Sequence, residues 1–172
     1  MARRLVSPPL HTAPNTPPLP FLQKAFEQIA LAKTATSALE AKDMGFLTED
    51  VRIVMNADHL ISAAKREVVD LADGYTPPEH GATVYASARS ARAALEMGVK
   101  TMQWGHYASD YDGVIAGHVA RVLTGGDISL PQWVPEEYLL TLEKKAFLAL
   151  LKQQKTHERI DALLTTGKPK RN

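Results

Sequence analysis

The side chains best suited to metal or acid–base chemistry gather in one short polar stretch, which reads HYASDYD. A metal site there would use His106, Asp110, Asp112 and His118. The Asp-x-Asp-Gly run lacks the later oxygen ligands and the closing Glu of a calcium loop, and the two histidines lack the i, i+4 spacing of a helical zinc pair. We therefore predict no metal site. The simpler interpretation is that Ser109 or Asp110 caps the helix that follows, with acidic residues in its first turn.

Nucleophilic catalysis would need a nucleophile, a base and a group that orients the base. The chain has no cysteine, which excludes thiol catalysis and disulfides. The carboxylate pair Glu136-Glu137 stands at the start of a predicted helix, where the helix dipole explains it. No Ser or Asp is placed by sequence to complete a triad, and we predict no catalytic residue. The six histidines are dispersed along the chain: His11, His59, His80, His106, His118 and His157.

The charged and glycine-rich stretches have ordinary structural interpretations. Gly125-Gly126 follows a predicted helix, as a helix end does, whereas a phosphate loop precedes a helix and ends in Lys-Ser/Thr. The basic residues of 83–104 are interrupted by Glu96, which favours a solvated face. The basic tail 168–171 is also expected to be solvated. Lys plus Arg is 20 and Asp plus Glu is 19, so nucleic-acid binding through the basic termini is only a weak alternative, which a steep salt dependence would reveal.

The chain begins with a proline-rich stretch, residues 1–20, which contains six prolines between Pro8 and Pro20. This density predicts an extended leader without helix. Apolar residues then recur at helical spacing from Phe21 to Ala32, with Pro20 in the first turn, where proline is tolerated. Lys33 follows this predicted helix. It is expected either to lie solvated near the helix end or to face a phosphate or carboxylate.

The clearest signals for helix starts and helix ends lie between Phe26 and Leu71. Thr36 or Ser37 is expected to cap a short helix in a capping box with Glu40, and the helix is expected to end at Met44 because Gly45 suits a helix exit. The β-branched run Val51–Met55 predicts a strand. Asn56 then caps a second helix, whose apolar residues share one face: Leu60, Ile61, Ala64, Val68 and Leu71.

A Gly- and Pro-rich break at residues 74–81 predicts an internal boundary, after which the pattern is helical. One long helix is predicted from Thr83 to Trp104, where Gly105 stops it, and another from Tyr111 to Thr124. Two prolines then frame Trp133, which is expected to cover the edge of the core. The remaining helices are predicted to begin at Pro135-Glu136 and at a Thr156 cap, the last ending at Gly167. The fold class is therefore mainly α.

Several stretches carry a family resemblance. The run IALAKTATSALEAKDMGFL followed by DVRIVMNADHLISAAK resembles the closing part of a crotonase-type enoyl-CoA hydratase domain, in the version fused to bacterial 3-hydroxyacyl-CoA dehydrogenases of fatty-acid β-oxidation. YLLTLEKKAFLALLKQQKTHERIDALLTTGKPKRN and HVARVLTGGDI resemble the tail of the same multifunctional proteins. The resemblance spans roughly residues 20–172. It implies a Pro-rich leader (1–20), a crotonase-like segment of helices with one short strand (21–76) and a helical tail domain or bundle (82–172).

The resemblance also shows what this chain lacks. It contains no GxGxxG motif and no Gly-Gly-Gly-x-x-Glu turn, so the NAD site and the hydratase carboxylates of the family would lie outside it. The expected function is that of a C-terminal, non-catalytic region that closes an acyl-CoA site and makes subunit contacts, whether as a piece of a larger enzyme or as a stand-alone relic. NAD and acyl-CoA are the ligands implied for the full-length family, and this chain is expected to hold no cofactor of its own, although acyl-CoA remains a possible partner.

Composition adds a few limits. The chain has 172 residues, nearly half of them hydrophobic, which is enough for a real core. No apolar run approaches the roughly eighteen residues that a membrane span requires, and the first residues lack the apolar core of a signal peptide. A cytoplasmic protein is expected. The rival hypothesis is a stand-alone helical interaction or scaffold module without a link to CoA, supported by the Ala-rich helix of 83–104 and by the apolar helix faces.

Overall fold

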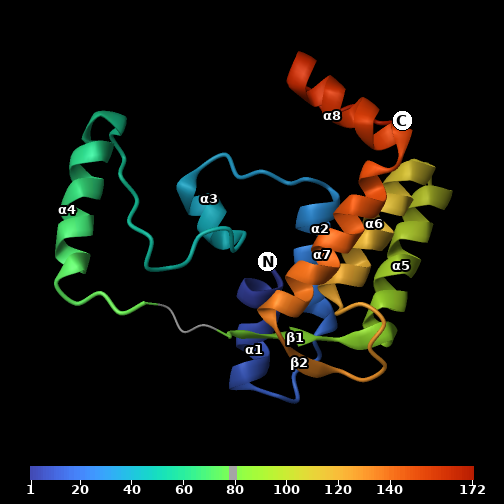
Figure 1. Ribbon diagram of the computed structural model, residues 1–172, viewed down its shortest axis with the longest axis horizontal. Helices are drawn as coiled ribbons and strands as arrows, with labels where there is room; N and C mark the ends of the chain where they lie inside the picture. Colours follow the sequence, from blue (N-terminus) through green and yellow to red (C-terminus); the bar gives the residue numbers. More distant parts are fainter. Residues whose placement is uncertain (78–80) are drawn as a thin grey trace. The chain divides into compact units, whose positions relative to one another are not determined.

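The computed structural model describes residues 1–77 and 81–172. The chain forms two compact units, one made of Met1–Thr34 with Gly81–Asn172 and the other of Ala35–His80. Helices dominate, with one short two-stranded sheet (Figure 1), so the mainly-α prediction is confirmed.

The two units divide the chain differently from the predicted ranges 1–20, 21–76 and 82–172, because the N-terminal residues pack with the C-terminal half. No helix in the described part of the chain is long and apolar enough to cross a membrane.

The Pro-rich N-terminus is helical, and the prediction of an extended leader over residues 1–20 is wrong. A π-helical turn (η1, Ala2–Val6) leads into α1 (Ser7–Thr12), and α2 follows at Leu19–Ala30. Prolines occupy the first turns of α1 and α2, where the backbone N–H that proline lacks would have no helical partner anyway. Val6 and Leu10 are buried. These residues therefore form part of the core.

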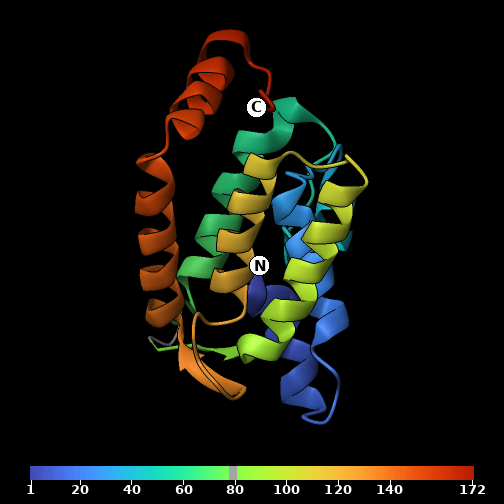
Figure 2. The same ribbon diagram turned by 90° about the vertical axis from the view of Figure 1, so that its right-hand side faces the viewer.

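Helix α6 (Asp110–Leu123) is the central element of the first unit, because it contacts α2, α5 (Ala88–Trp104) and α7 (Glu136–Leu151). Figures 1 and 2 show these helices side by side. The core lies between them, where small residues of α6 let its neighbours approach closely. The buried core residues of the four helices include Leu22, Ala25, Phe26, Leu95, Ala116, Ala120, Leu123 and Leu139.

The helix predicted over Thr83–Trp104 begins later than expected. Residues Thr83–Ala86 form strand β1, which pairs antiparallel with β2 (Gln132–Pro135) and places Tyr85 opposite Trp133. Ala88 has a φ of 65°, so the backbone turns sharply between strand and helix. The end of the helix is as predicted, with Gly105 at its C-cap. Branched and aromatic side chains suit a strand that has a partner, and here the partner comes from a segment almost fifty residues away.

Trp133 lies on this small sheet. Its ring stacks on His11 with centroids 3.9 Å apart and meets Tyr85 edge-on at 5.3 Å. The indole is 37% exposed, so it covers the side of the sheet and the end of α1 with one face open to solvent. Such aromatic contacts stabilise beyond simple burial, and here they join α1 to the sheet formed by β1 and β2.

The predicted helix ends are mostly correct. Ser109 and Asp112 form a complete capping box at the start of α6, and left-handed glycines follow α6 and α8 (Gln154–Thr166). The predicted Thr156 cap is wrong, because α8 begins at Gln154 with Gln153 as its N-cap. The Thr156 hydroxyl instead lies 2.5 Å from the Tyr111 hydroxyl. It therefore fixes α8 against α6.

The second unit contains α3 (Ala38–Asp43), a 3₁₀ turn (η2, Ala57–His59) and α4 (Leu60–Ala72). The predicted Ser37 cap is confirmed, because the Ser37 side chain accepts the Glu40 N–H at 3.1 Å. The Asn56 side chain accepts the Asp58 N–H at 2.9 Å and so caps η2, whereas the N-cap of α4 itself is His59. Residues 51–55 are irregular, so the strand predicted there is wrong. No other described segment pairs with it, and a β-prone run alone does not make a strand.

The predicted boundary at residues 74–81 is only partly visible, since Pro78, Glu79 and His80 lie outside the described residues. Among the described residues of this unit only Ala63 is buried in α4, whereas the apolar face predicted for the helix is exposed, including Ile61 at 83%. The face therefore exists as a pattern on the helix but covers no core of its own.

Candidate functional site

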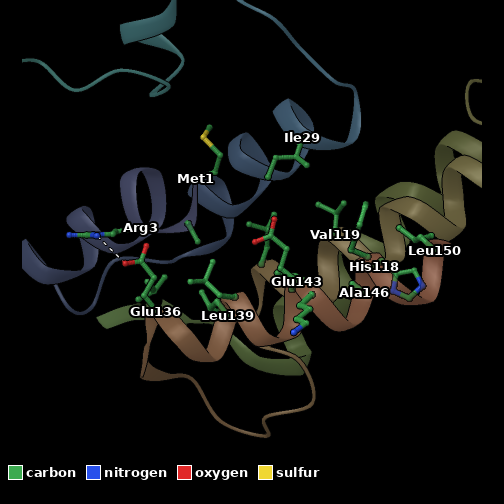
Figure 3. Close-up of a pocket in the computed structure, with 17 residues that line it drawn as sticks. Met1, Arg3, Ile29, His118, Val119, Glu136, Leu139, Glu143, Ala146 and Leu150 are labelled. Carbon is green, nitrogen blue, oxygen red and sulfur yellow. Dashed lines mark hydrogen bonds and ion pairs between the residues drawn. The ribbon is translucent and has the colours of Figure 1, made fainter. Parts of the chain in front are cut away.

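An apolar cleft of about 800 Å³ lies in the first unit between the N-terminal segment, α2, α6 and α7. Figure 3 shows side chains from all four parts converging on it. This volume falls within the range of small-molecule sites, which combine mostly apolar walls with a few polar groups. The apolar wall residues from the N-terminus, α2 and α6 include Met1, Ile29, Val119, Val122 and Leu123.

Helix α7 forms the longest wall of the cleft. Its lining residues recur three or four apart from Glu136 to Leu150, which is the spacing of one helix face. Pro135 sets the start of this helix, and the acidic Glu136 and Glu137 suit the positive end of its dipole. The apolar members of the face are Leu139, Leu140, Ala146, Phe147 and Leu150. The local sequence therefore presents an apolar ridge to the cleft.

Charged and polar side chains lie at both ends of this apolar wall and between them. At one end Arg3 Nη1 lies 3.0 Å from Glu136 Oε2, whereas His118 lies at the other end beside Ala146 and Leu150 (Figure 3). Glu143 lies between them on α7. The arrangement suits an elongated apolar group with polar ends. It does not bring a nucleophile, a base and an orienting group together, because the Arg3–Glu136 pair and His118 occupy opposite ends of the cleft.

The residues considered from the sequence for metal binding have other roles. Asp112 belongs to the capping box, and His118 lines the cleft on α6. Among residues 1–77 and 81–172, no group of three His, Asp or Glu side chains could hold a metal ion. Lys33 is exposed just after the end of α2, 3.5 Å from the likewise exposed Glu27, which agrees with the expectation of a solvated lysine near the helix end. His80 lies outside the described residues.

The cleft itself was not predicted. Its lining comes from segments separated by more than a hundred residues, such as Arg3 and Glu136, and sequence spacing alone does not bring these together. One signal was present in α7, which carries large apolar residues on more than one side. Leu140 lines the cleft and is 57% exposed, whereas Leu148 does not line it and is 49% exposed. A helix that is apolar nearly all round is expected to be covered on both sides.

The Asp112 side chain accepts hydrogen bonds from two separate parts of the first unit. Arg159 Nη1 on α8 donates to its Oδ1 at 2.8 Å, and the Ser109 backbone N–H donates to its Oδ2 at 2.9 Å. Burial by itself would raise the pKa of Asp112. Hydrogen bonds from Ser109 and Arg159, together with the charge of Arg159, outweigh burial and lower the pKa. The carboxylate thus links the start of α6 to α8.

We expect Asp112→Asn to lower the free energy of unfolding by about 2 kcal/mol at pH 7, since it weakens a charge-assisted cap and an ion pair. A carboxylate with a lowered folded-state pKa contributes stability that is full above its unfolded pKa of about 3.9. That contribution disappears as the pH falls through the folded pKa. Urea unfolding should therefore show the full difference between the two proteins at pH 7 and a difference that shrinks as the pH falls below about 3.9.

Asp110→Asn is the matched control, because Asp110 shares the first turn of α6 and its dipole but is exposed. It should cost about 0.5 kcal/mol. Equal losses for the two variants, or a difference that does not shrink in acid, would contradict the role given to the Ser109 and Arg159 contacts.

Comparison with known proteins gives one informative similarity. The chain is 39% identical over 156 residues to the "Probable 3-hydroxyacyl-CoA dehydrogenase" of Bacillus subtilis (strain 168). The match covers 90% of this chain but 20% of the relative, so this chain spans about one fifth of that protein's length. No family model and no solved structure matches the chain. The chain is therefore similar to one part of a longer dehydrogenase.

Proposed function

We propose that this chain corresponds to the C-terminal, non-catalytic region of a fatty-acid β-oxidation protein with 3-hydroxyacyl-CoA dehydrogenase and enoyl-CoA hydratase parts. The observation that carries the proposal is the 39% identity to a probable 3-hydroxyacyl-CoA dehydrogenase along 90% of the chain. The hydratase part rests on the crotonase-like resemblance of the sequence alone. Such a protein would act in the cytoplasm, with NAD and acyl-CoA as ligands of the complete enzyme.

The non-catalytic role is supported by the architecture of the described residues. A dinucleotide site needs parallel strands joined by a helix, with a Gly-rich turn at the helix start. The described part of this chain has one antiparallel pair of four-residue strands instead. These residues do not fit NAD, so hydride transfer would belong to another part of the enzyme. The cleft likewise offers no nucleophile–base set.

The role proposed for the cleft is to close an acyl-CoA site. Its apolar ridge on α7 would cover the acyl chain, and the charged groups at its ends would stay near solvent. On α7, Leu148 is 49% exposed and does not line the cleft, so it would also provide contacts to other parts or subunits of the enzyme. Burying such residues is favourable by about 25 cal/mol per Å² of apolar surface.

The test is calorimetric titration of the purified chain with CoA and with octanoyl-CoA. We expect saturable binding of octanoyl-CoA with a dissociation constant in the micromolar range, on the order of −8 kcal/mol, and weaker binding of CoA. Leu140→Asp places a charge in the apolar wall at a half-exposed position and should weaken octanoyl-CoA at least about tenfold. Leu163→Asp is the control, because Leu163 is 53% exposed on α8 and does not line the cleft.

The rival function is a stand-alone helical interaction module. It is favoured by the exposed apolar face of α4, where Ile61 and Val68 are 83% and 66% exposed. Self-association would not separate the two functions, since both expose apolar surface. Absence of binding to both CoA compounds would put the interaction module ahead. Equal binding by the native chain and Leu140→Asp would show that the cleft is not the acyl site.

A further inference from the structure

A second, smaller cavity of about 330 Å³ lies in the same unit, between α2, α5, α6 and the end of the chain. It shares no lining residue with the cleft. Its inner wall is apolar and is built mainly by α2 and α5. The apolar residues of this wall are Phe26, Ala30, Leu31, Ala94, Leu95, Val99, Met102 and Ala116. Its volume is at the lower end of the range for ligand sites.

Three cations from the C-terminal part line the other side of the cavity: Arg159, Lys170 and Arg171. The tail that carries two of them turns back to the start of α6, where the Asn172 backbone oxygen accepts the Ser109 hydroxyl at 3.2 Å (Figure 1). The tail is thus folded against the helices, although a solvated tail was expected from the sequence. The cavity combines an apolar interior with a basic side.

The cations differ in how far they are already neutralised. Arg159 is engaged by Asp112 and Asn172, and Lys170 lies 2.9 Å from Glu158 near solvent. The two acidic residues of the lining are also paired, Asp112 with Arg159 and Glu27 with Lys33. Within the described part of the chain, Arg171 has no carboxylate partner. It is therefore the guanidinium that remains for an anionic group, with Lys170 beside it in sequence.

We propose that this cavity binds a medium-chain fatty carboxylate, with its alkyl chain against Phe26, Val99 and Met102 and its carboxylate near Lys170 and Arg171. An alkyl chain fits walls that offer no hydrogen-bond partner, and a carboxylate matches the planar guanidinium. The inference does not depend on the proposed function, because it concerns a different cavity and different residues.

Calorimetry of the full chain with decanoate, decanol and decylammonium tests both halves of the proposal. Decanoate should bind most tightly. Its affinity should be about fivefold higher than that of decanol, because only decanoate can form a partly exposed ion pair. Decylammonium should bind least. Affinity should rise about fourfold for each methylene from hexanoate to decanoate, as burial of apolar surface requires. Equal affinity for decanoate and decanol would overturn the cationic half.

Gly98 supplies a variant that fills the cavity without breaking the fold. It lies inside α5 and lines the cavity, and a Cβ added there would meet no atom within 4 Å. Leucine also has a higher helix propensity than glycine, so Gly98→Leu should stay folded. We expect this substitution to lower the affinity for decanoate at least tenfold. Gly117→Leu is the matched control, because Gly117 lies inside α6 with equally open space and does not line this cavity.

Variants of the C-terminal tail test the basic side of the cavity. Lys170→Ala/Arg171→Ala should weaken decanoate about fivefold and leave decanol unchanged, whereas Lys168→Ala, on the same tail but outside the lining, should leave both unchanged. Undiminished binding by Gly98→Leu, or an equal loss in Gly117→Leu, would overturn the placement of the ligand. Leu140→Asp should not affect decanoate, so failure here and failure of the acyl-CoA proposal are separate results.

Discussion

Leu22→Ala is expected to lower the free energy of unfolding by about 3 kcal/mol, as large-to-small changes do at fully buried leucines. Leu22 is 0% exposed on α2 and belongs to the core cluster that also includes Val6, Phe26 and Ala120. The substitution removes apolar contacts and leaves a void between the N-terminal segment and the helices. Urea unfolding, followed by the helical circular dichroism signal at about 222 nm, measures the change in the free energy of unfolding.

Leu130→Ala is the matched control, because the same side chain is 74% exposed there. Its cost should stay within about 0.5 kcal/mol. The comparison also tests whether the N-terminal residues belong to the core, because Leu22 is buried partly by them. If Leu22→Ala and Leu130→Ala lower the free energy of unfolding equally, the packing of residues 1–34 with 81–172 is not what stabilises this unit.

The helix boundaries were the most predictable part of this structure. Ser37 and Ser109 each cap the helix expected of them, and Asn56 caps the 3₁₀ turn that leads into α4. The reason is physical: a cap depends on a side chain and a backbone group two or three residues away, so the sequence contains the whole interaction. The same holds for the glycines that end α6 and α8.

The errors arose where a distant segment decides the outcome. Thr83–Ala86 is a strand because Gln132–Pro135 pairs with it, and the equally β-prone Val51–Met55 is irregular because nothing described pairs with it. The Pro-rich start differs from its prediction for a related reason. Proline density argues against helix interiors, but the position of Pro8 and Pro9 in a first turn is compatible with a helix, and burial of Val6 and Leu10 favours it.

The two cavities could not be derived from sequence at all. Each is formed by residues from three or more segments: Arg3 with Glu136 at the cleft, and Phe26 with Arg171 at the smaller cavity. Periodicity identified the apolar faces of α2, α5 and α7 without saying which faces meet. The sequence predicts a solvated basic tail, because four charged or proline residues at a chain end usually are solvated. Only the fold shows that this tail lines a cavity.

Gly125→Ala is the second substitution for which a large effect is expected, about 3 kcal/mol of destabilisation. Gly125 has a φ of 87°, where an L-residue costs roughly 1–2 kcal/mol. A Cβ there would also lie 2.5 Å from the Cβ of Ala86, on the neighbouring strand β1, and 2.9 Å from the Ile128 side chain. Overpacking of this kind adds about 1–3 kcal/mol because one of the two backbones must shift.

Gly167→Ala separates the two contributions. Gly167 has a φ of 68°, but an added Cβ meets no atom within 4 Å, so only the backbone cost of roughly 1–2 kcal/mol applies. Ala86→Gly combined with Gly125→Ala removes the clashing methyl group. A double-mutant cycle by urea unfolding should then show a favourable coupling of about 1 kcal/mol or more. Additive losses in that cycle, or equal losses at Gly125 and Gly167, would mean that contact with β1 does not require glycine at position 125.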